Sequence, residues 1–330
     1  MNSALNTMNK FDYIMISAHG RSGTNWLLEV LDLSAHTYCR NEPNELKDSL
    51  LNGLGSEWVI ENDGAVLNGM WDKAISKTAI SIGSRDHKIS CDKDFLRAFP
   101  RSLGVYRLVR SSRIRRLINK IKPTASCHEW LASPLVFKRN QMHEALTVIK
   151  INQAPGWACW LLENRKHAGI LHIVRHPAGM LNSWRKRYLN KNVYEKVEAE
   201  NRDRLNKIAR FAPKWRDRFG DIDSMSVEES ELWFWCYSTE TVHLAGQSNE
   251  RYHLVLFDEL AGNPDKAARE VYQFCGLDYT TDICNQVRRL SENSQSIASS
   301  WKKTISDQDR QKIERICSGS LISEWWPDVV

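Results

Sequence analysis

The feature that most constrains this chain is a short apolar segment that runs through a small loop into an amphipathic helix, residues 11–33 (FDYIMISAHGRSGTNWLLEVLDL). Residues 13–16 have the uninterrupted apolar character of a buried strand, and Gly20 and Gly23 delimit a tight turn. Apolar side chains then recur at helical spacing over 26–31. Because a loop that enters a helix presents unpaired backbone N–H groups and the positive end of the helix dipole, it suits a phosphate or sulfate.

The side chains of this loop favour the same kind of ligand. Arg21 supplies a fixed positive charge with several donors, and Ser22 and Thr24 supply hydroxyls. An ordinary strand-to-helix turn capped by Ser22 or Thr24 is the alternative. The lysine and the spacing of a Walker A loop, G-x-x-x-x-G-K-[ST], are missing, which disfavours an ordinary ATPase.

Composition places the chain among ordinary globular proteins. Its 330 residues are 42% hydrophobic and 26% charged, which suits one large α/β domain or two modest ones. The net charge of +6 suits an enzyme that binds a polyanionic nucleotide, but basic residues spread along the whole chain do not indicate a nucleic-acid partner. The eight cysteines form no C-x-x-C pair, so we expect free thiols and neither zinc nor disulfides.

Targeting signals are not apparent. No run of about eighteen apolar residues occurs, and the first residues lack the basic, apolar and small-residue pattern of a secretory signal. We therefore expect a soluble, cytoplasmic protein without a membrane partner.

A second strand-to-helix junction carries phosphate-binding chemistry. Residues 169–174 (GILHIV) are predicted to form a buried strand, and RHPAGMLNSW follows at 175–184. Arg175 at a strand end suits bidentate phosphate recognition, and Pro177 suits a first helical turn. Ser183 then lies two turns into the helix, where its hydroxyl can reach the same phosphate. Taken alone, this pattern would also fit an ordinary strand-to-helix junction that binds no ligand.

The two junctions together resemble the nucleotide site of sulfotransferases that use 3′-phosphoadenylyl sulfate (PAPS). RSGTNWL at 21–27 resembles their 5′-phosphosulfate loop, and 175–184 resembles their 3′-phosphate site, with Arg175 and Ser183 at the family's spacing of eight residues. The resemblance implies that Arg175 and Ser183 bind the 3′-phosphate of PAPS. It implies that the 5′-phosphosulfate is held by Arg21, Ser22, Gly23, Thr24 and Asn25.

Two further segments are similar to parts of that nucleotide site. Trp26 directly follows the first loop, where cytosolic members stack a tryptophan on the adenine. The segment 300–303 (SWKK) is similar to one that closes the nucleotide site, which implies roles for Trp301 and Lys302. The family's basic R-K-G triplet is missing from the preceding SENSQSIASS.

The resemblance also implies a catalytic base. Glu42 lies 21 residues after Arg21 in a region, 36–50, that we interpret as a loop, and several carbohydrate and bacterial members carry a glutamate base there. Partial burial would raise the pKa of such a carboxyl toward neutrality. Glu45 is the next candidate, and His87 is a third because cytosolic members use a histidine. The alternatives are a surface acidic loop and a structural histidine.

The pattern of elements predicts the fold class. We expect an α/β fold, a P-loop-type parallel sheet flanked by helices as in sulfotransferases, with one domain over 1–330 and a helical insertion at 188–229. The insertion is expected to flank the acceptor pocket, although a dimer surface or a lid would also fit. Helices are expected at 155–164 and from 229 to about 244. Strands are expected at 13–17, 84–90, 146–151, 170–174 and 252–257.

The functional hypothesis is in-line transfer of the sulfuryl group of PAPS to a hydroxyl or amine of a small-molecule or carbohydrate acceptor. Its products would be the sulfated acceptor and 3′-phosphoadenosine 5′-phosphate (PAP), and no metal is required. Arg21 would also stabilise charge on the leaving phosphate oxygen. The alternatives are a P-loop-type kinase and a non-catalytic nucleotide-binding protein, and a homodimer is one of the oligomeric states left open.

Overall fold

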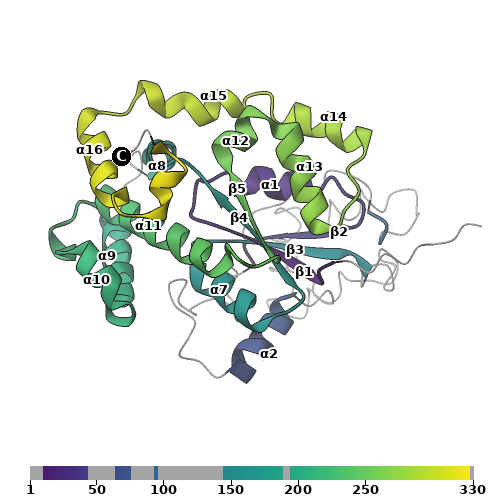
Figure 1. Ribbon diagram of the computed structural model, residues 1–330, viewed down its shortest axis with the longest axis horizontal. Helices are drawn as coiled ribbons and strands as arrows, with labels where there is room; N and C mark the ends of the chain where they lie inside the picture. Colours follow the sequence, from purple (N-terminus) through teal and green to yellow (C-terminus); the bar gives the residue numbers. More distant parts are fainter. Residues whose placement is uncertain (1–9, 44–63, 76–92, 96–143, 189–193, 328–330) are drawn as a thin grey trace, which may run out of the picture.

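The sheet is parallel throughout the part of the chain that the computed structural model describes, residues 10–43, 64–75, 93–95, 144–188 and 194–327. Within these ranges five strands pair in the order β2-β3-β1-β4-β5 (Figure 1). Because all five run in the same direction, their carboxyl ends meet at one edge of the sheet. The strands are β1 (Tyr13–Ala18), β2 (Thr37–Asn41), β3 (Leu146–Asn152), β4 (Ala168–Val174) and β5 (Tyr252–Leu256).

Helices cover both faces of the sheet and extend beyond its carboxyl edge (Figure 1). The helices of the first half are α1 (Thr24–Leu31), α2 (Gly64–Ile75), α7 (Pro155–Asn164) and α8 (Pro177–Tyr188). Those that follow are α9 (Tyr194–Phe211), α10 (Pro213–Phe219), α11 (Val227–Gly246), α12 (Phe257–Gly262), α13 (Pro264–Cys275), α14 (Thr281–Leu290), α15 (Ser294–Ser299) and α16 (Asp307–Cys317). Short 3₁₀ helices lie at η2 (Ile222–Ser224), η3 (Ser300–Lys303) and η4 (Leu321–Glu324).

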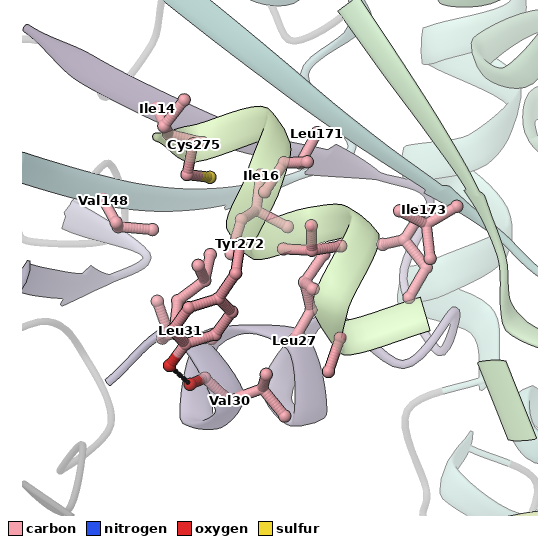
Figure 2. Packing of buried hydrophobic residues seen from close by; sticks show 14 of the residues in the cluster. Ile14, Ile16, Leu27, Val30, Leu31, Val148, Leu171, Ile173, Tyr272 and Cys275 are labelled. Carbon is pink, nitrogen blue, oxygen red and sulfur yellow. Dashed lines mark hydrogen bonds between the residues drawn. The ribbon is translucent and has the colours of Figure 1, made fainter. Parts of the chain in front are cut away.

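The alternation of side chains along β1 separates two hydrophobic cores. Ile14 and Ile16 point to the face covered by α1 and α13, whereas Tyr13 and Met15 point to the face covered by α7. Figure 2 shows the first of these cores, in which the Tyr272 hydroxyl donates a hydrogen bond of 2.7 Å to the backbone carbonyl of Val30. The two faces thus anchor β1, and with it the loop that follows it.

A third core lies beyond the carboxyl edge of the sheet. It joins α8, α9, α10, α11 and α16 and is rich in tryptophan. Figure 1 shows α9, α10 and α16 grouped at one end of the molecule. The helical character expected of 188–229 is confirmed where that range is described, by α9, α10 and η2.

Most of the predicted elements are confirmed. The predicted strands at 13–17, 146–151, 170–174 and 252–257 correspond to β1, β3, β4 and β5. The helix predicted at 155–164 is α7, and the one predicted from 229 is α11. The strand predicted at 84–90 lies outside the described residues.

The interpretation of 36–50 as a loop was wrong for Thr37–Asn41, which form β2. This segment, TYCRN, is short and carries polar residues, so it has no apolar run that would identify a strand. Its five residues are nevertheless buried, because it pairs with β3 from Thr37↔Leu146 to Asn41↔Lys150. Long-range pairing, which the local sequence does not encode, makes it a strand.

No helix in the described ranges is both long enough and apolar enough to cross a membrane.

Candidate active site

A cavity of about 400 Å³ lies at the carboxyl edge of the sheet, a volume typical of small-molecule sites. Its walls come from the loops after β1, β2, β3 and β4 and from α1, α8, α11, α12 and α15. The lining residues are Gly20, Arg21, Gly23, Thr24, Asn25, Glu42, Asn152, Gln153, Arg175, Ser183, Trp184, Arg187, Tyr188, Glu231, Phe257 and Ile297.

The loop after β1 forms a tight turn. Arg21 has φ 72° and Gly23 has φ 93°, both in the left-handed region, and α1 begins directly at Thr24. A side chain at Gly23 would also collide with the Phe257 ring, since an added Cβ would lie 2.6 Å from its Cε2. Gly23 is therefore required by both its backbone angle and its packing.

Arg21 and Arg175 reach the cavity from opposite halves of the sequence. The Arg21 Nε donates to the Ser183 hydroxyl at 3.1 Å, so the first loop already contacts the helix of the second junction. The Arg175 guanidinium donates to the backbone carbonyls of Arg21 at 3.2 Å and of Ile297 at 2.9 Å. The two predicted phosphate sites are thus adjacent.

Arg175 is an unusually buried cation. It is 4% exposed and lies over the Phe257 ring, with 4.7 Å between the guanidinium carbon and the ring centroid. Burial lowers the pKa of Arg175 to about 10, with a smaller lowering from Arg21 and an opposing effect of Asp258. Its Nε has no hydrogen-bond partner among the described residues. An anion in the cavity would offset the cost of burying this charge.

Glu42 lies at the end of β2, where its backbone N–H still donates to the Lys150 carbonyl at 2.9 Å. Its side chain is buried and lines the cavity. The Lys150 ammonium lies 3.4 Å from its Oε1, and the Asn152 side-chain amide donates to the same oxygen. The carboxylate is therefore held in one orientation with its charge compensated.

The position of Lys150 follows from the pleat of β3. Leu146 and Val148 point into the core under α1, and Lys150 continues on the same face at the carboxyl end of the strand. There its Nζ also donates to the Asn25 Oδ1 at 2.5 Å. One buried ammonium thus links the first loop to the candidate base.

A second buried carboxylate, Glu231, lines the cavity from α11. Its Oε1 lies 3.2 Å from the His19 Nε2, and its Oε2 accepts a hydrogen bond from the Asn201 amide at 2.8 Å. Burial alone would raise the pKa of Glu231, but the charge and hydrogen bond of His19, together with Arg204 and Asn201, outweigh it and hold the pKa below its usual range. This side chain is an ionised carboxylate at neutral pH.

Several residues predicted for the nucleotide site lie in or beside the cavity. Thr24 and Asn25 line it, at the start of α1. Ser22 does not line it, but its hydroxyl is buried and has no hydrogen-bond partner in the described parts of the chain. Trp26 packs against the core under α1, and its indole N–H donates to the Ser291 hydroxyl at 3.0 Å. It is not among the cavity-lining residues.

The segment around Trp301 lies behind Arg175. The Trp301 ring is buried and stacks on the His176 ring, with centroids 4.1 Å apart. Lys302 is exposed. Neither Trp301 nor Lys302 lines the cavity. The two other candidate bases, Glu45 and His87, lie outside the described residues.

Sequence reasoning overlooked several residues that line or support the cavity: His19, Lys150, Asn152, Gln153 and Glu231. Two of them left a signal. Lys150 is a charge at the end of an apolar strand, and Glu231 is a lone carboxylate in the otherwise apolar stretch ELWFWCY. Each of these two charges interrupts the apolar pattern of its element, and each is buried beside a charged partner at the cavity.

Clusters that could hold a metal were not found in the described ranges, where no three His, Cys, Asp or Glu side chains come together suitably.

Residues 13–282 match the family described as "Sulfotransferase family". No curated protein matches the chain.

Among solved structures, similarity extends to the sulfotransferase domain of the Synechococcus PCC 7002 olefin synthase, at 15% identity over 93% of each chain with a TM-score of 0.45. The sulfotransferase domain from the curacin biosynthetic pathway is 13% identical over 93% of this chain and 96% of its own, with a TM-score of 0.45. Mouse sulfotransferase SULT7A1, crystallised with PAP, is 12% identical over 97% of this chain and 89% of its own, with a TM-score of 0.44.

Proposed function

The chain belongs to the sulfotransferase family, and from this we propose that it transfers the sulfuryl group of PAPS to a hydroxyl or amine of a small-molecule or carbohydrate acceptor, releasing PAP. One observation carries the proposal. Arg21 and Glu42, which follow neighbouring segments of the first 42 residues, line the same cavity as Arg175, which lies more than 130 residues further along the chain. Cations suit an anionic sulfuryl donor, and a carboxylate can take the proton of the acceptor.

The residues present fit a phosphorylated nucleotide. Arg175 is buried with an unpartnered Nε, and the Ser22 hydroxyl is buried without a hydrogen-bond partner among the described residues. Both are costs that phosphate oxygens would offset. In the proposal Arg175 and Ser183 hold the 3′-phosphate, and Arg21 through Asn25 hold the 5′-phosphosulfate. Trp26 stacks on the adenine, and Trp301 and Lys302 close the site.

When bound, PAPS supplies an activated sulfuryl group on its 5′-phosphate. Arg21 stabilises the negative charge that develops on the phosphate oxygen as the sulfur–oxygen bond breaks. Lys150 keeps Asn25 and Glu42 at fixed positions relative to each other. As in phosphoryl transfer, positioning and electrostatics account for most of the catalysis.

Glu42 is the proposed base. It accepts the proton of the acceptor hydroxyl or amine while the acceptor atom forms its bond to sulfur, and the bond between sulfur and the phosphate oxygen breaks. Its orientation by Asn152 and Lys150 supports this role, because a base must be held within hydrogen-bond reach of the proton it takes.

Isothermal titration of the purified protein with PAP, ADP and ATP, without added metal, tests the proposal. We expect micromolar or tighter binding of PAP, much weaker binding of ADP, and loss of PAP binding in Arg175→Ala. Arg202→Ala is the matched control, since Arg202 pairs with Glu198 on α9 and does not line the cavity. Equal affinity for PAP and ADP would show that the protein does not recognise the 3′-phosphate, and a preference for ATP would favour a kinase.

A further inference from the structure

We propose that Glu231 determines which acceptors are used, by accepting a hydrogen bond from a second donor group of the acceptor. The acceptor would then be a compound with at least two donors, such as a polyol, a sugar or an amino alcohol. One hydroxyl or amine is sulfated, and another binds Glu231. This inference rests on the proposed function and adds to it the chemical class of the acceptor.

The first observation is the location of Glu231 relative to the candidate base. Glu42 approaches the cavity from the end of β2, and Glu231 approaches it from α11. The cations predicted to hold the nucleotide, Arg21 and Arg175, line the same cavity. A molecule that fills the remaining volume and presents one group to Glu42 therefore also has a second carboxylate, Glu231, in the wall of its cavity.

The second observation is that Glu231 is held in place and still has acceptor capacity. His19 lies beside one oxygen, and Asn201 donates to the other. Arg204 in turn donates to the Asn201 Oδ1 at 3.0 Å, which fixes the amide orientation. A carboxylate has about four lone-pair sites, so a rigid acceptor remains available on the cavity side.

The third observation concerns the surrounding walls. Trp184 and Tyr188 line the cavity from α8, with their ring centroids 5.3 Å apart, and Asn152 and Gln153 line it from the end of β3. Apolar ring faces beside several hydrogen-bonding side chains suit a compound with C–H surfaces and several polar groups. A simple apolar alcohol would offer no donor to Glu231 and would lack the hydrogen bond that a second donor makes there.

Glu231 is thus a specificity-determining residue and differs in role from Glu42. Sites built to hydrogen-bond a substrate donor discriminate strongly against analogues that lack it. Loss of a hydrogen bond to a charged group corresponds to a decrease of about 10- to 100-fold in kcat/KM. The decrease should affect acceptors with a second donor and spare those without one.

The experiment measures transfer from [³⁵S]PAPS to three matched pairs of acceptors: tyramine and 4-ethylphenol, 6-aminohexan-1-ol and hexan-1-ol, trans-cyclohexane-1,2-diol and cyclohexanol. Wild-type protein should favour the first member of at least one pair by about 10-fold or more. Glu231→Gln should lose most of that preference, whereas the control Glu229→Gln should retain it. Glu229 lies on the same helix but pairs with Arg315 and does not line the cavity.

Glu231→Asp provides a second variant if the glutamine variant folds poorly, because it keeps the charge and withdraws it from the cavity. PAP titration of each variant distinguishes failure of the proposed function from failure of the role assigned to Glu231. If wild-type protein fails to bind PAP, the proposed function fails. If PAP binds but no two-donor compound is sulfated, or the preference survives in Glu231→Gln, the inference about Glu231 is overturned while the nucleotide site stands.

Discussion

At the scale of single residues, backbone strain is concentrated at the cavity. In the described ranges, the non-glycine residues with positive φ are Arg21, Glu42 and Gln153, at 72°, 46° and 55°. All three line the cavity. Each such conformation costs on the order of 1–3 kcal/mol and persists only where the surroundings enforce it. Each lies within three residues of the carboxyl end of a strand, so all three side chains lie at the same edge of the sheet.

Glu42→Gln tests the base. The amide cannot take a proton from the acceptor but has nearly the same shape, so turnover of [³⁵S]PAPS with accepted acceptors should fall by about 10²- to 10⁴-fold. PAP affinity measured by titration should remain within about twofold, since Glu42 is not expected to contact the phosphates. Glu163→Gln, on the exposed side of α7, is the matched control. Unchanged turnover would eliminate Glu42 as the base.

At the scale of elements, the turn between β1 and α1 depends on a single glycine. Gly23→Ala would place a side chain in the left-handed region and against the Phe257 ring, so we expect a loss of about 2–4 kcal/mol of unfolding free energy. PAP affinity should fall as well, because the same turn presents the anion-binding groups. Urea unfolding and titration measure the two effects.

Gly20→Ala is the control for this prediction. It lies in the same loop, but its added Cβ would make only an ordinary contact, 3.8 Å from the Gln153 Nε2. We expect a change of less than about 0.5 kcal/mol. A Gly23 variant as stable as the Gly20 variant would contradict the packing argument.

A network of charges joins three helices at the end of the molecule. Arg185 on α8 bonds Glu228 on α11 through Nε at 2.6 Å and Asp309 on α16 through Nη2 at 2.6 Å. Its hydrogen bonds hold the pKa values of both carboxyls below their usual range. Because the folded-state pKa values are depressed, their contribution is complete above the unfolded-state values of about 4 and is lost as the pH falls through the folded ones.

Arg185→Met should therefore destabilise the protein by about 2–3 kcal/mol at pH 7, less than for a fully buried pair because the three side chains keep some exposure. The unfolding free energy of the variant should also depend less on pH below about 5. Chemical denaturation between pH 3 and pH 7 measures both. Arg202→Met removes an exposed pair on α9 and should change stability by less than about 1 kcal/mol. Equal acid sensitivity of Arg185→Met and wild type would contradict this assignment.

At the scale of the whole molecule, the cavity joins segments that lie far apart in the chain. Arg21, in the first loop, bonds Ser183, and Arg175 bonds the carbonyl of Ile297. A nucleotide held by Arg21, Arg175 and Ser183 would bind only where these segments come together in the folded chain. We therefore expect PAP at 100 times its Kd to add about 2.7 kcal/mol to the unfolding free energy, seen as a rise in Tm.

ADP at the same concentration should raise the Tm less, and Arg175→Ala should abolish the effect of PAP. A Tm that does not respond to PAP would show that the nucleotide does not bind the folded state. The single domain over 1–330, the homodimer and the acceptor role of the helical insertion remain predictions.

Much of the architecture could be predicted because it depends on local patterns. The apolar runs of β1, β3, β4 and β5 and the turns that follow β1 and β4 are encoded within short windows. Arg21 and Arg175 could be predicted as candidate site residues because Arg175 directly follows β4 and Arg21 lies three residues after β1. Since parallel strands end at one edge, their proximity followed as well.

Features that depend on contacts between distant segments became visible only in the folded chain. Residues 37–41 become β2 by pairing with β3, and that pairing delivers Glu42 to the cavity beside Lys150. Glu231 lies about 190 residues after Glu42, and although its charge stands out in an apolar stretch of α11, nothing local shows that it reaches the same cavity. Local sequence was enough to predict the two loops proposed to bind anions, because backbone turns and strand ends depend on neighbouring residues. The carboxylates that would face an acceptor are positioned by packing, and packing is a property of the whole fold.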